Sequence, residues 1–184
     1  LEETRAAELR AALWELPGQA ESILNDYTAV IEAAARYYCF NGFLYMARGI
    51  NLASALEGAL KIKEIAYIHA EGYAAGEMKH GPIAMIDPTF ATIAIAVESR
   101  TYDKILSNIR EVKARSGEVI AIANTHDTTI DNYADRVIRV PKTEELFSPV
   151  LVAIPLQLMA YFVACSRSPN VDQPRNLAKT VTVE

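Results

Sequence analysis

Four short, mostly apolar runs recur along the chain, with helical patterns between them. They are Phe43–Ala47, Thr92–Val97, Val119–Ala123 and Arg136–Val140. Strands that are apolar on both faces are typical of a parallel sheet that helices cover on both sides. The pattern therefore predicts a doubly wound α/β sandwich, in which ligands bind beyond the carboxyl ends of the strands.

Helical spacing of apolar residues accounts for most of the chain around these strands. The predicted helices are Leu1–Leu16, which ends at Pro17-Gly18, then Gln19–Tyr37, Leu52–Ile68, Tyr102–Arg115 and Pro149–Ser166. We expect one domain over residues 37–166, linker or entry helices over 1–36, and a tail over 167–184 that folds over the active site.

Composition excludes several classes of protein. The 184 residues carry a net charge of −5, with Lys and Arg spread along the chain, which argues against nucleic-acid binding. The longest apolar stretch, Val150–Cys165, is interrupted and too short to predict a membrane span. Because no secretory signal is visible, we expect a cytoplasmic protein. A chain that starts at Leu1, already inside a helix, is expected to be a piece of a longer protein.

Neither a metal site nor a cofactor is predicted. The three histidines are scattered, and none has a second ligand at a spacing typical of metal sites. Arg48-Gly49 lacks the glycine pattern of a dinucleotide-binding turn. Cys39 and Cys165 sit alone in apolar segments, so we expect free, buried thiols.

A row of charges on the helix after the first strand is the first candidate for chemistry. Offsets of four and seven residues place Glu57, Lys61 and Glu64 on one helix face. Spacing alone favours a solvated face with ion pairs. The alternative is a carboxylate base held beside a lysine, as proton transfer from carbon requires.

Two further segments carry polar residues that packing does not require. In the run His69–Pro82, Lys79 and His80 suit the last turn of a helix capped by Gly81, although a histidine could also help to open a sugar ring. The tail Val171–Glu184 would be disordered by default. Its apolar residues favour burial instead, and folding back would bring Lys179 near a site.

Together, Glu57–Glu64, His69–Pro82 and Asp172–Lys179 resemble the isomerase region of the glucosamine-6-phosphate synthase family, also called glutamine–fructose-6-phosphate aminotransferase (isomerizing). The resemblance covers essentially the whole chain and matches the second sugar-isomerase (SIS) half. It implies a three-layer α/β sandwich with a five-stranded parallel sheet, and adds a short strand near Glu71–Tyr73. Asp172-Gln173-Pro174 resembles bacterial members.

The resemblance also implies a reaction and its residues. The family joins glutamine-derived ammonia to open-chain fructose 6-phosphate and isomerises the product to glucosamine 6-phosphate. By resemblance Glu64 is the base that moves the proton between C1 and C2. His80 opens the ring and is donated by the neighbouring subunit of a homodimer. Lys179 forms a Schiff base with the sugar. Glu57, Lys61 and Arg175 are the supporting residues.

The chain departs from the family pattern in two respects. The Ser/Thr-rich phosphate loop belongs to the first SIS half, and its counterpart here, Arg48–Ser54, is poor in hydroxyls. The glutaminase nucleophile is also missing. We therefore expect the glutaminase domain and the first half as partners, and weak sugar-phosphate binding without them. Two alternatives stay open: a sugar-phosphate-sensing SIS module without catalysis, and a fructosamine-phosphate deglycase.

Overall fold

The computed structural model describes residues 2–167 and 170–175. In this part of the chain, five parallel strands form one sheet in the order β2-β1-β3-β4-β5. The strands are β1 (Gly42–Ala47), β2 (His69–Ala74), β3 (Phe90–Ala96), β4 (Glu118–Asn124) and β5 (Arg136–Val140). The predicted α/β class and the five-stranded parallel sheet are confirmed.

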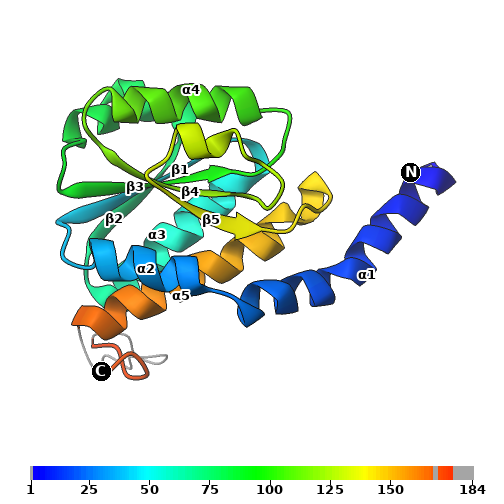
Figure 1. Ribbon diagram of the computed structural model, residues 1–184, viewed down its shortest axis with the longest axis horizontal. Helices are drawn as coiled ribbons and strands as arrows, with labels where there is room; N and C mark the ends of the chain where they lie inside the picture. The colour runs from blue at the N-terminus through cyan, green and yellow to red at the C-terminus, as the bar shows by residue number, and fades with distance from the viewer. Residues whose placement is uncertain (1, 168–169, 176–184) are drawn as a thin grey trace, which may run out of the picture.

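Helices cover both faces of the sheet, so the molecule has three layers (Figure 1). One layer contains α2 (Thr28–Tyr37), α3 (Leu52–Ala66) and α5 (Ser148–Arg167), and α1 (Glu3–Asn25) joins its core through Leu16 and Ile23. The other contains α4 (Tyr102–Lys113) and two 3₁₀ helices, η2 (Ala75–His80) and η3 (Pro82–Met85). Each layer has its own apolar core against the sheet.

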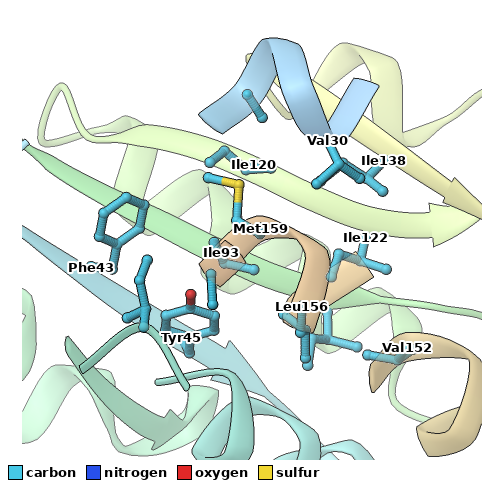
Figure 2. Close-up of a cluster of buried hydrophobic side chains, with 14 of the residues drawn as sticks. Val30, Phe43, Tyr45, Ile93, Ile120, Ile122, Ile138, Val152, Leu156 and Met159 are labelled. Carbon is cyan, nitrogen blue, oxygen red and sulfur yellow. The ribbon is translucent and has the colours of Figure 1, made fainter. Parts of the chain in front are cut away.

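The larger core lies between the sheet and the layer of α2, α3 and α5. Figure 2 shows its side chains interdigitating, with Tyr45 of β1 beside Ile93 of β3 and Leu156 of α5. Strand residues alternate between the two cores, since Phe43 and Tyr45 face this layer while Leu44 and Met46 face α4. This two-sided burial explains why the central strands are continuous apolar runs.

The prediction that the first helix ends at Pro17-Gly18 is wrong. α1 continues through Pro17 to Asn25 and extends away from the sandwich (Figure 1). A proline inside a helix costs about 3 kcal/mol, because it removes a hydrogen bond and crowds the preceding turn. Leu16 and Ile23, on either side of Pro17, are buried in the core that includes α5, and this burial offsets the cost.

The helical stretch Glu145–Arg167, which includes α5, is long and apolar enough by length and composition to cross a membrane. The sequence-based argument was made for Val150–Cys165 alone, and the helical stretch of the structure is longer than that run. Its apolar residues have another explanation, because Leu151, Leu156 and Met159 are buried against the sheet and α3. A core helix of this kind needs no bilayer.

The prediction of buried thiols is also wrong, because Cys39 and Cys165 are both free and exposed. Cys39 lies in the turn after α2, two residues beyond Tyr37, the last buried residue of that helix. Cys165 follows two buried residues of α5, Val163 and Ala164, and the helical rotation turns it outward. An apolar neighbourhood in the sequence does not determine which face of a helix a residue occupies.

Candidate active site

A row of three charged residues lies on the solvent side of α3. Lys61 Nζ is 2.7 Å from Glu64 Oε2 and 3.6 Å from Glu57 Oε1. The hydrogen bond to Glu64 is the main cause that raises the pKa of Lys61, and Coulombic attraction to Glu57 adds to it. Lys61 is therefore protonated at neutral pH. All three side chains are partly open to solvent, so the row can reach a ligand.

A close contact with the edge strand β2 sets the position of α3. A Cβ at Gly72 would lie 2.9 Å from both Cα and N of Leu56, and 3.0 Å from the carbonyl oxygen of Ala55. Real Cβ atoms essentially never come this close to backbone. The missing side chain at Gly72 therefore lets α3 rest directly on β2, and this fixes where Glu57 and Glu64 are presented.

The described end of the tail lies on the last turn of α3. The backbone N–H of Arg175 donates to Tyr67 Oη at 2.7 Å, and its guanidinium carbon is 4.3 Å from the centre of the Tyr67 ring. Tyr67 caps α3 in a left-handed conformation, three residues after Glu64. Arg175 thus meets the helix that carries the charged row. Lys179 lies outside the described residues.

His80 is the last residue of η2 and projects outward. Its side chain is 74% exposed, and its only charged neighbour in the described chain, Glu77, lies at 4.0 Å. The predicted helix end exists here as a 3₁₀ helix, and Gly81 follows with φ +144°, a conformation that side chains disfavour. Ala75 and Met78 are buried, so η2 is anchored while its end stays open.

Glu64 and His80 are not brought together within this chain. α3 ends near the amino end of β2, whereas η2 begins at its carboxyl end, and a six-residue strand spans about 17 Å. The two elements also cover opposite faces of the sheet, since α3 packs with α5 and η2 packs with α4. One chain therefore presents these two side chains to different places.

The turn after β1 is occupied by internal contacts. Ser54 Oγ lies 3.2 Å from Asn51 Oδ1, and Asn51 Nδ2 donates to Ser148 Oγ at 2.8 Å. All three side chains are buried. Ser54, the hydroxyl of the Arg48–Ser54 segment, thus ties the start of α3 to the start of α5 and does not face a ligand.

A hollow of about 240 Å³ at the carboxyl ends of β3 and β4 was not predicted. Its polar residues hold one another: His126 Nε2 is 3.2 Å from Glu98 Oε2, and Tyr102 hydrogen-bonds Asp127. The hydrogen bond from Lys142 lowers the pKa of Glu98. The sequence signal was the polar residues that follow two central strands. Among the described residues, no group of three metal-ligating side chains gathers.

Comparison with known proteins shows the family. The SIS domain model matches residues 37–167. The glutamine–fructose-6-phosphate aminotransferase (isomerizing) of Methanosarcina mazei is 51% identical over 170 residues, which are 92% of this chain and 28% of that protein. The Aquifex aeolicus enzyme of the same name is 52% identical over 172 residues, 94% of this chain and 29% of that protein. The chain thus spans less than a third of these curated relatives.

A solved structure agrees with the sequence matches. The C-terminal domain of glucosamine-fructose-6-phosphate aminotransferase from Francisella tularensis superposes with a TM-score of 0.86 and 32% sequence identity. The similarity covers 94% of this chain and 49% of that one. The SIS domain model matches most of the chain, and the fold superposes on that of the solved aminotransferase domain. The chain therefore belongs to the SIS domain family.

Proposed function

We propose that this chain is the second SIS half of a glutamine–fructose-6-phosphate aminotransferase (isomerizing). The full enzyme would convert fructose 6-phosphate and glutamine-derived ammonia to glucosamine 6-phosphate and water. The observation that carries the proposal is the ion-paired row on α3, with Lys61 2.7 Å from Glu64. Sequence identity near 50% to enzymes of that name supports it.

Glu64 is the proposed base in this scheme. After the amine nitrogen has replaced the C2 oxygen of the open-chain sugar, a carboxylate takes a proton from C1 and returns it to C2. This transfer converts the ketose skeleton to an aldose. Lys61 holds the carboxylate on the exposed side of α3 and keeps it in one place, as a base that acts on carbon requires. Glu57 supports Lys61 from the other side.

His80 is the proposed ring-opening residue, and it acts on the site of a neighbouring subunit. Its distance from Glu64 along β2, and its place on the other face of the sheet, support an arrangement in which two subunits share each site. The exposure of His80 fits a side chain that reaches outward. A homodimer is therefore part of the proposal.

Lys179 is the proposed nucleophile. Its amine attacks the C2 carbonyl carbon of the open-chain sugar and water leaves, which gives an imine. Ammonia then adds to the imine carbon and the lysine amine leaves, so that the C2 nitrogen of the product comes from ammonia and the resulting imine acidifies the C1–H bond. Residues 167–184 would close over the site and exclude water. The contact of Arg175 with Tyr67 supports this closure, because it brings the chain to α3 four residues before Lys179.

The remaining partners come from outside this chain. The first SIS half would bind the sugar phosphate, and the glutaminase domain would supply ammonia. We place the enzyme in the cytoplasm, with residues 1–36 as the arm that joins the two halves.

The test is the isomerisation of fructose 6-phosphate to glucose 6-phosphate by this chain, with and without the first SIS half supplied in trans. Activity should need both halves, and Glu64→Gln should abolish it. Glu21→Gln, at an exposed residue of α1 without an ion pair in the described chain, is the matched control and should keep full activity. If both halves associate and bind the sugar but neither interconversion nor amination occurs, the proposal fails and the chain is a binding module.

A further inference from the structure

Arg48 joins the turn after β1 to both α4 and η2. Its Nε donates to Asn108 Oδ1 at 3.0 Å, and Asn108 is 5% exposed. The guanidinium also lies over Gly76 of η2, where a Cβ would be 3.2 Å from Nη2. Because α3 begins at Leu52, Arg48 lies at the entry to the helix that carries the charged row.

The same polar chain continues to the residue before His80. Asn108 Nδ2 donates to Glu111 Oε2 at 3.3 Å, and Glu111 Oε1 lies 2.9 Å from Lys79 Nζ. The side chain of Glu111 is 22% exposed, whereas that of Lys79 is 61% exposed. The partly buried carboxylate of Glu111 therefore ties the end of η2 to α4.

Apolar contacts make the rest of η2 equally fixed. Ala75 and Met78 are buried in the core that contains Ile105 and Ile109 of α4. The side chains of His80 and Glu77 in η2 are 74% and 69% exposed, and among the described residues neither has an ion pair apart from their mutual approach at 4.0 Å. The packing thus fixes η2 and leaves the imidazole of His80 exposed at its end. A catalytic group that acts on the site of another subunit needs such a fixed position.

We propose that Glu111 is a positioning residue for His80, acting through Lys79. This inference rests on the proposed function. Glu111 accepts from Asn108 with one oxygen and pairs with Lys79 through the other, and so it fixes the end of η2 from which His80 reaches the neighbouring site. Arg48 fixes the other end of the same network and links it to the start of α3.

The test uses both SIS halves together and measures kcat and KM for isomerisation. Glu111→Gln keeps an acceptor for Asn108 but loses the charge that holds Lys79. We expect kcat to fall about tenfold with KM unchanged, since a misplaced acid–base group weakens the chemical step more than binding. Lys79→Met, at an exposed site where folding is not at risk, should give the same loss. Asp103→Asn, at another acidic residue of α4 that has no ion pair in the described chain, should change neither.

A double-mutant cycle separates positioning from general stability. On a His80→Gln background, Glu111→Gln should cause no further loss of kcat, because there is no imidazole left to position. A tenfold loss that persists in full on that background would overturn the inference while the proposed function stands. A wild-type pair of halves without any isomerase activity would overturn the proposed function and the inference with it.

Discussion

Glu64 and His80 lie at opposite ends of strand β2 and on opposite faces of the sheet. Glu64 belongs to the last turns of α3, which packs with α5. His80 ends η2, which rests on α4. If both residues serve one substrate, two chains must contribute them.

This geometry predicts complementation between two impaired variants in the presence of the first SIS half. Alone, Glu64→Gln should abolish isomerase activity, and His80→Gln should leave only the residual activity that spontaneous ring opening permits. Mixed and re-associated, they should regain about a quarter of the wild-type sites, because half of the dimers are mixed and half of their sites are intact. Activity of the mixture against each variant alone is the measurement. A mixture that gains no activity over the variants alone, although exchange of subunits is demonstrated, would contradict sharing of the site.

Replacing Lys61 should impair catalysis without a matching loss of stability. An ion pair that is a third exposed contributes at most about 1 kcal/mol to folding. Lys61→Gln should therefore leave the thermal midpoint nearly unchanged, yet lower kcat about tenfold, because Glu64 loses the group that holds it in place. Lys63→Gln, at an exposed lysine of the same helix, is the control for loss of charge. Equal kcat in the two variants would show that the row is only a solvated face.

Adding a side chain at Gly72 should disturb the contact between β2 and α3, the helix that carries the charged row. Gly72→Ala would place a methyl group 2.9 Å from the backbone of Leu56, so α3 must move off β2. We expect a loss of about 1–3 kcal/mol in the free energy of unfolding, together with lower activity. Chemical denaturation measures the first effect.

Gly18→Ala is the matched control for that substitution. Gly18 lies inside α1, and a methyl group added there would meet nothing within 4 Å, so alanine should stabilise the chain by about 0.5–1 kcal/mol. If Gly72→Ala were as stable as the wild type, the contact between α3 and β2 would not be what positions the helix.

The central strands were predictable because each is buried on both faces, but β2 was found only through the family resemblance. β2 lies at the edge of the sheet and pairs with β1 alone. Its face toward α4 carries His69, Glu71 and Tyr73, while the other face needs small residues under α3. An edge strand of this composition has no continuous apolar run, and its glycine suggests a turn when the close contact with Leu56 is unknown.

The candidate site was also predictable from the sequence only in part. The spacing of Glu57, Lys61 and Glu64 sufficed to predict one ion-paired face, because neighbours on a helix are fixed by its repeat. The separation of Glu64 from His80 depends on the order of the strands and on which layer each helix joins. The network from Arg48 to Lys79 crosses three elements far apart in the sequence, so spacing could not reveal it.

The buried hydroxyl of Tyr45 should make the free energy of unfolding fall at alkaline pH. Its hydroxyl is buried without a hydrogen-bond partner in the described chain, and burial raises the pKa of Tyr45 (Figure 2). An unfolded tyrosine releases its proton near pH 10, while the folded one still holds it. The unfolded state therefore binds fewer protons above that pH. Stability is fully present below about pH 10 and falls as pH rises, by up to about 1.4 kcal/mol per pH unit from this residue.

Tyr45→Phe removes this contribution, and it also removes a buried hydroxyl that lacks a partner. We expect stability at neutral pH equal to the wild type or about 1 kcal/mol higher, and a shallower loss above pH 10. Tyr37 and Tyr102, whose pKa values burial also raises, should keep part of the alkaline loss. Tyr38→Phe, at an exposed ring, is the control and should follow the wild-type curve. Denaturant unfolding between pH 8 and pH 11 measures these free energies. If the loss of stability above pH 10 were as steep in Tyr45→Phe as in the wild type, water would reach the hydroxyl of Tyr45 and the prediction would be wrong.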